Sequence, residues 1–227
     1  MQWTRPIGIG DDPLMKDYRR REIALAAGLS AVAGYVDAVG FLKLGGFFVS
    51  FMSGNSTRLG VGIATGHWDM ARTALALIGL FVLGATLGAL VARRAGEGRR
   101  SWVLALEAGL LALGAGLIGL GFGPAGAAAV VLAMGAENAA FQRNGDVGLG
   151  LTYMTGTLVK IGQRIAMALT GGDRWAWAPF AWLWLGLALG GALGAFAYLR
   201  WGELALWAAA GVVAVLAAVS ARWEARA

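Results

Sequence analysis

The chain has 227 residues, of which 58% are hydrophobic and only 14% are charged, and its mean hydropathy is +0.65. A water-soluble domain needs a more polar surface than this composition supplies, so soluble classes are excluded. Cysteine is absent, which excludes disulfides and thiolate metal sites, and the net charge of +6 comes from basic residues in short loops beside apolar runs. We therefore expect an all-α integral membrane protein whose partner is the lipid bilayer, with no nucleic acid partner.

The first predicted element follows a polar N-terminal tail, residues 1–21, that ends in three arginines. The next apolar run contains Ala31-Val32-Ala33, which resembles a signal-peptide cleavage site. Because the run continues past Ala33 and the tail is long, we expect a retained first span with a cytoplasmic N-terminus.

Eight apolar segments follow one another along the chain, and most approach the roughly 20 residues that cross a bilayer. The second and sixth, called here the two polar segments, carry basic and amide side chains well inside their length, namely Arg58, Lys160, Gln163 and Arg164. The eight are Ile23 to Leu44, Phe47 to Thr65, Ala71 to Ala92, Trp102 to Gly121, Ala125 to Phe141, Leu149 to Thr170, Pro179 to Leu199 and Leu204 to Ser220.

The polar segments contain an internal repeat. Phe51 to Gly60 and Tyr153 to Gly162 share the pattern aromatic-M-[ST]-G-x-x-x-[RK]-x-G, at an offset of 153 − 51 = 102. Two further matches occur in the same order: Gly34 to Ala38 with Gly135 to Ala139, and Leu83 to Ala89 with Leu189 to Ala195. The sequence therefore predicts two homologous halves, residues 22–122 and 123–221, followed by a C-terminal tail at 222–227.

The basic loop at residues 93–100 decides between two topologies. If all eight segments crossed the membrane, this loop would face outward, against the positive-inside rule. If the polar segments are re-entrant or broken instead, six full spans remain, and both termini and the basic loop are cytoplasmic. Three spans in each half invert the second half relative to the first, as in many secondary transporters. We expect this inverted-repeat architecture, in a bacterial inner membrane.

Two motifs resemble a known family. A-G-Y-V-D-A-V-G-F at residues 33–41 and F-V-S-F-M-S-G-N-S-T-R-L-G at residues 48–60 are similar to the signature of the YoaK-like family of bacterial membrane proteins, and the similarity extends over nearly the whole chain. That family is uncharacterised, so the resemblance implies a multi-span inner-membrane protein and supplies no substrate or catalytic residue.

Each half carries an acid in one span and a base in the polar segment that follows: Asp37 with Arg58, and Glu137 with Lys160. An isolated charge at the centre of a membrane helix costs about 2.5–3.5 kcal/mol on insertion scales, so such residues usually pair or line a cavity. These four residues either line a substrate site, whose bases attract an anionic group, or form neutralising pairs that fix the polar segments.

The other candidates for substrate binding are polar side chains and glycines close to these charges. The same residue types also serve as ordinary helix-packing positions. No catalytic, metal or cofactor motif accompanies them. They are Ser53, Gly54, Asn55, Asn138, Thr155, Gly156 and Arg164.

These features predict a carrier or channel for a small solute, with an anionic solute favoured, and a polar centre between the halves. The glycine-rich faces also favour a homodimer. A non-transporting membrane sensor or assembly protein stays open, because a cavity alone is only an analogy to transporters. A weaker alternative is an intramembrane hydrolase with Ser53 as nucleophile and His67 as base, which requires the two side chains to lie within hydrogen-bond reach. We expect no enzyme.

Overall fold

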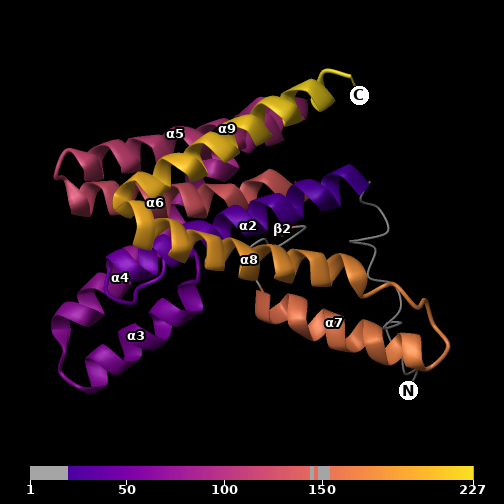
Figure 1. The fold of residues 1–227 in the computed structure, drawn as a ribbon, viewed down its shortest axis with the longest axis horizontal. Coiled ribbons are helices and arrows are strands. Elements are labelled where there is room, and N and C mark those ends of the chain that lie inside the picture. The colour runs from indigo at the N-terminus through magenta and orange to yellow at the C-terminus, as the bar shows by residue number, and fades with distance from the viewer. Residues whose placement is uncertain (1–19, 144–145, 148–153, 227) are drawn as a thin grey trace, which may run out of the picture.

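The computed structural model describes residues 20–143, 146–147 and 154–226 (Figure 1). These residues are helical almost throughout, apart from β1 (Gln142–Arg143) and β2 (Asp146–Val147), which form one short antiparallel pair. The all-α fold predicted from the sequence is thus confirmed. The helices are α2 (Arg20–Lys43), α3 (Met52–Ala64), α4 (Trp68–Ala95), α5 (Arg99–Gly119), α6 (Gly123–Glu137), α7 (Met154–Leu169), α8 (Ala178–Trp201) and α9 (Ala205–Glu224), with 3-10 turns η1 (Gly96–Gly98), η2 (Asn138–Phe141) and η3 (Gly202–Leu204).

Four helical stretches within the described residues are long and apolar enough to cross a membrane: Arg21–Lys43, Trp68–Gly119, Gly123–Phe141 and Ala178–Glu224. The second and fourth each contain two long helices, because η1 separates α4 from α5 and η3 separates α8 from α9. Each break begins at a glycine with positive φ, 59° at Gly96 and 58° at Gly202. Glycine adopts this conformation without the steric penalty of a Cβ atom.

The outer faces of these helices are apolar. On α8, Leu189, Leu193, Phe196 and Leu199 are all more than half exposed. The opposite face of α8 is buried and carries small residues such as Gly190 and Gly194. A soluble protein places its large apolar side chains inside, so this arrangement is that of a helix with a lipid-facing surface.

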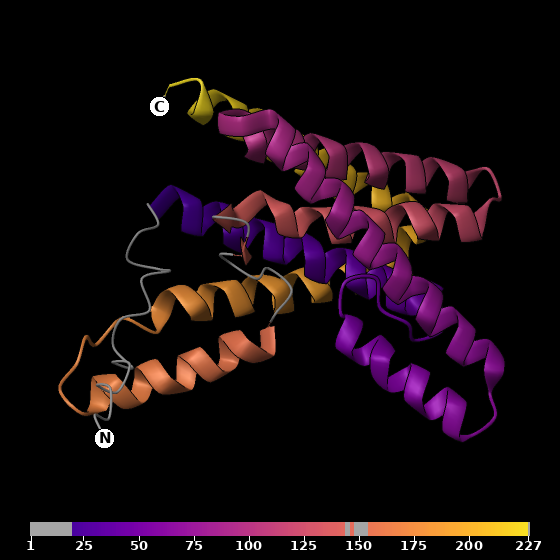
Figure 2. The ribbon, with the colours of Figure 1, turned by 180° about the vertical axis from the view of Figure 1, so that it is seen from behind.

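Helices α3 and α7 are shorter than the others. With 13 and 16 residues, they are about 20 Å and 24 Å long, less than the roughly 30 Å of hydrocarbon in a bilayer. Their N-terminal ends lie near each other at the middle of the molecule, and the two helices diverge towards its opposite ends (Figures 1 and 2). Each packs against the helix that follows it, α3 on α4 and α7 on α8. The structure therefore turns the two polar segments into a pair of short helices that point at each other.

Helices from the two predicted halves, residues 22–122 and 123–221, pack against each other. Helix α8 packs on α2, and α4 packs on α6, each pair parallel and joined through glycines. The glycines occupy equivalent positions in the two halves, since 190 − 84 = 194 − 88 = 106. A Cβ atom on any of the four would clash with backbone atoms of the facing helix: Gly84 with Leu132, Gly88 with Ala136, Gly190 with Ala31, and Gly194 with Tyr35.

Ion pairs join the helix ends. At one end of the bundle, the Lys43 ammonium contacts the Glu203 carboxylate and so joins α2 to η3. At the other end, Arg100 Nη2 lies 2.8 Å from Glu22 Oε1, and the Arg100 backbone N–H donates to Glu224 Oε1 at 3.1 Å. The starts of α2 and α5 and the end of α9 therefore meet at one end.

Candidate functional site

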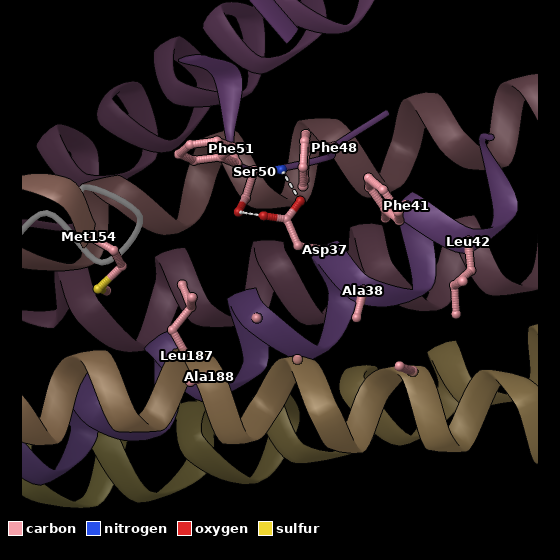
Figure 3. A pocket seen from close by; sticks show the side chains of 13 residues that line it. Asp37, Ala38, Phe41, Leu42, Phe48, Ser50, Phe51, Met154, Leu187 and Ala188 are labelled. Carbon is pink, nitrogen blue, oxygen red and sulfur yellow. Dashed lines mark hydrogen bonds between the residues drawn. The ribbon is translucent and has the colours of Figure 1, made fainter. Parts of the chain in front are cut away.

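Asp37 on α2 fixes the loop that leads into α3. Its Oδ1 atom accepts hydrogen bonds from the backbone N–H groups of Val49 and Ser50 at 2.7 and 2.8 Å. Its Oδ2 atom accepts one from the Ser50 hydroxyl at 2.6 Å (Figure 3). Three donors thus compensate the partial burial of this carboxylate, and they attach the loop before α3 to the C-terminal third of α2.

Asn55 holds the same loop from the other side. This fully buried side chain accepts a hydrogen bond from the Phe48 N–H at 3.1 Å and donates one to the Phe48 carbonyl at 2.7 Å. The amide therefore pairs with both backbone groups of Phe48. These two bonds fix the conformation of the loop before α3.

Among the described residues, the structure contains neither of the two ion pairs that the sequence offered as one alternative. Asp37 bonds to the loop, while the Arg58 guanidinium lies over the Phe47 ring at 5.0 Å, almost two helical turns after the start of α3. The groups that donate to Asp37 belong to Val49 and Ser50, in the loop directly before α3, whereas Arg58 lies further along that helix. In the second half, both carboxylate oxygens of Glu137 have no hydrogen-bond partner among the described residues, and Lys160 Nζ lies 5.5 Å from the centre of the Phe180 ring.

Two adjoining cavities lie beside this loop. The larger, of about 550 Å³, is bounded by α2, α8, the loop and Met154, and Figure 3 shows its lining. The smaller, of about 380 Å³, lies between the starts of α3 and α7. Both are lined by Ser50, Phe51 and Met154, so the two cavities lie side by side at these residues.

The repeated motif lines the smaller cavity from both halves. Met52 and Ser53 come from the first turn of α3, and Met154, Thr155 and Gly156 come from the first turn of α7. The positive ends of two helix dipoles are therefore directed at one cavity. The hydroxyls of Ser53 and Thr155 occupy equivalent positions in the repeat.

The larger cavity is mostly apolar. None of its six large apolar side chains was predicted from the sequence, because the predicted site residues were charged residues, other polar residues and glycines. Asp37 and Ser50 are its polar members, and their oxygens are hydrogen-bonded to each other. The apolar members are Phe41, Leu42, Phe48, Phe51, Met154 and Leu187.

The structure brings four of the predicted site residues to these cavities: Asp37, Ser53, Thr155 and Gly156. The others lie elsewhere. Gly54 gives space to the rings of Phe48 and Phe51, and the Asn138 amide donates to the Met134 carbonyl at 3.0 Å. The predicted residues that line neither cavity are Gly54, Asn55, Arg58, Glu137, Asn138, Lys160 and Arg164.

The nucleophile and base of the hydrolase alternative are not neighbours. Ser53 is in the first turn of α3, and His67 follows its last turn, so most of that helix separates them. His67 Nδ1 lies 2.8 Å from the Thr65 hydroxyl instead. Within the described ranges, no cluster of three or more His, Asp or Glu residues is arranged to hold a metal ion.

The family model described as "Protein of unknown function (DUF1275)" matches residues 25–219. A UPF0700 transmembrane protein from Rhizobium meliloti (strain 1021) is 35% identical over 216 residues, which cover 92% of this chain and 93% of that protein. No solved structure gives a match. The narrower YoaK-like label stays a prediction. Together with its apolar helices, these similarities make the chain a membrane protein that belongs to the DUF1275 family.

Proposed function

We propose that this protein is a carrier or channel for a small solute, which passes between the facing ends of α3 and α7. The observation that carries the proposal is the convergence of the two copies of the repeated motif on one cavity. A repeated sequence whose copies meet at one place marks the interface of the halves, where transporters built from repeats bind their substrates.

The proposed topology has six spans and two half-membrane helices. Helices α2, α4, α5, α6, α8 and α9 would cross the bilayer, while α3 and α7 would enter from opposite sides and end near its middle. Their short lengths and their divergence towards opposite ends of the molecule support this arrangement (Figure 2). The basic residues Arg93, Arg94, Arg99 and Arg100 would then lie together on the cytoplasmic side.

The lining narrows the class of solute. Arg58 and Lys160 line neither cavity, so the proposed attraction for an anionic group comes from the N-terminal ends of α3 and α7. Such dipole ends also repel cations in channels. The larger cavity offers aromatic and aliphatic surface, which favours a solute with an apolar body. A short-chain carboxylic acid combines both properties.

Osmotic swelling of proteoliposomes tests the proposal. The purified chain is reconstituted, and swelling is followed by light scattering with glycerol, urea, acetate and isobutyrate as probes. We expect protein-dependent entry that is fastest for isobutyrate. Because the chain has no native cysteine, Ser53→Cys can be blocked with a methanethiosulfonate reagent, and the block should reduce entry at least tenfold.

Ser56→Cys is the matched control. Ser56 is exposed on the same helix, bonds to the Met52 carbonyl and lines neither cavity. Its modification should leave entry unchanged. Vesicles that stay tight to every probe, or equal inhibition at both positions, would remove the transport role and favour a sensor or assembly protein.

A further inference from the structure

Two carboxylic acids in the core take no part in the cavities described above. Glu107 on α5 and Glu137 on α6 are both fully buried. All four of their carboxylate oxygens have no hydrogen-bond partner among the described residues. Buried polar groups are nearly always hydrogen-bonded, so two adjacent exceptions need an explanation.

The packing of α5 on α6 places these two side chains opposite each other. A Cβ atom on Gly114 would lie 2.7 Å from Val130 Cγ2, and one on Gly126 would meet Ile118, so the two helices are antiparallel. Glu107 lies seven residues before Gly114, and Glu137 lies seven residues after Val130, the residue that Gly114 faces (114 − 107 = 137 − 130 = 7). Seven residues are about two turns and return to the same helix face. The two carboxyl groups also lie close enough to interact electrostatically.

Two unpaired carboxylates cannot both remain ionised in such a place. Removing an ionised carboxylate from water without hydrogen-bond donors costs several kcal/mol, and a second negative charge beside it adds to that cost. Carboxyl pairs elsewhere solve this problem by sharing a proton. The surroundings here are apolar: the fully buried neighbours on the same two helices include Leu104, Leu111 and Met134.

Among the described residues, no basic side chain forms an ion pair with either carboxylate. Asp37 on α2 interacts with Glu137, and it is another acid. The remaining titratable groups of the described elements packed against α5 and α6 lie at helix ends or turns. These are Arg21, Glu22 and Lys43 on α2, Asp69, Arg72, Arg93 and Arg94 on α4, Glu97 in η1, Arg99 and Arg100 on α5, Glu203 in η3, and Arg222 and Glu224 on α9. The exception is Tyr35 within α2, whose hydroxyl donates to the Ala205 carbonyl.

We propose that Glu107 and Glu137 form a proton-binding site in the core, and that the proposed carrier exchanges this proton with solution. Binding forms one O–H bond on a carboxylate with a proton from hydronium and leaves water, and release reverses the step. A metal cation fits less well, because it needs several oxygen ligands and the described residues offer two carboxylates here. The exchange role rests on the proposed function, whereas the binding of the proton does not.

Infrared difference spectroscopy of the full chain in nanodiscs tests the site, with the proton itself as the probe. A protonated carboxyl group has a C=O stretching band that a carboxylate lacks. Exposed glutamates have pKa values of about 4.3, so at neutral pH this band reports only groups held in the protonated form. We expect the band at neutral pH, a small downshift in deuterium oxide, and at least a twofold loss of its intensity in the double variant E107Q/E137Q.

Glu97→Gln is the control, because Glu97 is exposed in η1. This variant should keep the full band. Since glutamine variants can fail to fold, Glu137→Asp provides a second measurement, in which the band should shift in frequency rather than disappear. Helix content by circular dichroism identifies the folded variants.

Several outcomes would overturn the site: no band in the wild-type chain, an unchanged band in E107Q/E137Q, or a band that disappears when sodium chloride replaces choline chloride. The last would show a sodium site. Failure of the proposed function is distinguishable, since vesicles that carry no solute would still contain a chain with the band.

Discussion

At the residue scale, Asp37 has a different partner from the one its charge suggested. A buried acid in a membrane helix is expected to seek a base, yet here it binds two backbone N–H groups and a hydroxyl. A single carboxylate can therefore fix the entry to α3 without any salt bridge. Arg58 is left to stack on Phe47.

A double-mutant cycle tests this reading. Asp37→Ala leaves two buried N–H groups without an acceptor, which should lower the free energy of unfolding by about 2–5 kcal/mol. Arg58→Leu removes the contact of the guanidinium with the Phe47 ring and its position beside Gly46, and it should have a smaller effect. Because the two side chains do not touch, the losses should add to within about 0.5 kcal/mol in thermal or denaturant unfolding. A coupling energy above about 1 kcal/mol would show instead that Asp37 and Arg58 interact as an ion pair.

The sequence indicated where polar chemistry lies, and the structure changed what each residue does. The repeated motif predicted three residues of the site, Ser53, Thr155 and Gly156. Asp37 was predicted because a charged side chain within a membrane span usually has a partner or lines a cavity. The aromatic lining could not be predicted, since Phe41 and Phe48 belong to long apolar runs, and the motifs that contain them do not reveal which way their rings face. The facing of Glu107 and Glu137 depends on the register of two helices, which one sequence does not reveal.

At the element scale, glycines set how closely the helices of the two halves approach. The sequence match between residues 83–89 and 189–195 reflects helix packing. Within it, Gly84 and Gly190 each lie against the backbone of a helix from the other predicted half. The partner helices could not be identified in advance, since α8 packs on α2 and α4 packs on α6, each across the predicted boundary between the halves.

Substitutions at these glycines test the close approach. Gly190→Ala places a methyl group against the Ala31 backbone, and the resulting overpacking should destabilise the protein by about 1–3 kcal/mol. Gly84→Ala should behave alike. Gly79→Ala and Gly211→Ala are the controls: nothing lies within 4 Å of the added atom, so they should be neutral or slightly stabilising. Tryptophan fluorescence during thermal unfolding measures all four, and equal effects would refute the glycine contacts.

At the scale of the whole molecule, the two short helices decide the topology. The segment predicted from Phe47 to Thr65 includes a loop, because α3 begins only at Met52. In the segment predicted from Leu149 to Thr170, residues 149–153 lie outside the described residues, and α7 extends over Met154–Leu169. Three spans and one half-membrane helix in each half remain a prediction that labelling can test.

Single cysteines can be introduced at exposed ends of the bundle, because the chain has no native cysteine. Glu97→Cys at η1 should be protected from an impermeant thiol reagent in intact spheroplasts, while Ala64→Cys at the last residue of α3 and Leu120→Cys after α5 should be labelled. Glu97 is preferred to Gly96, whose positive φ disfavours a side chain. Labelling at Glu97 together with protection at Ala64 would require eight full spans.

The packing of α8 on α2 also sets the order in which the helices can assemble during translation. The partner of Ala31 on α2 is Gly190 on α8, which leaves the ribosome 190 − 31 = 159 residues later. At about 5–20 residues per second, α2 therefore waits on the order of 8–30 s with its small-residue face open to lipid. The first half cannot finish folding while the second is still being translated, so the nascent chain must be held in the bilayer as a set of loosely associated helices until α8 arrives.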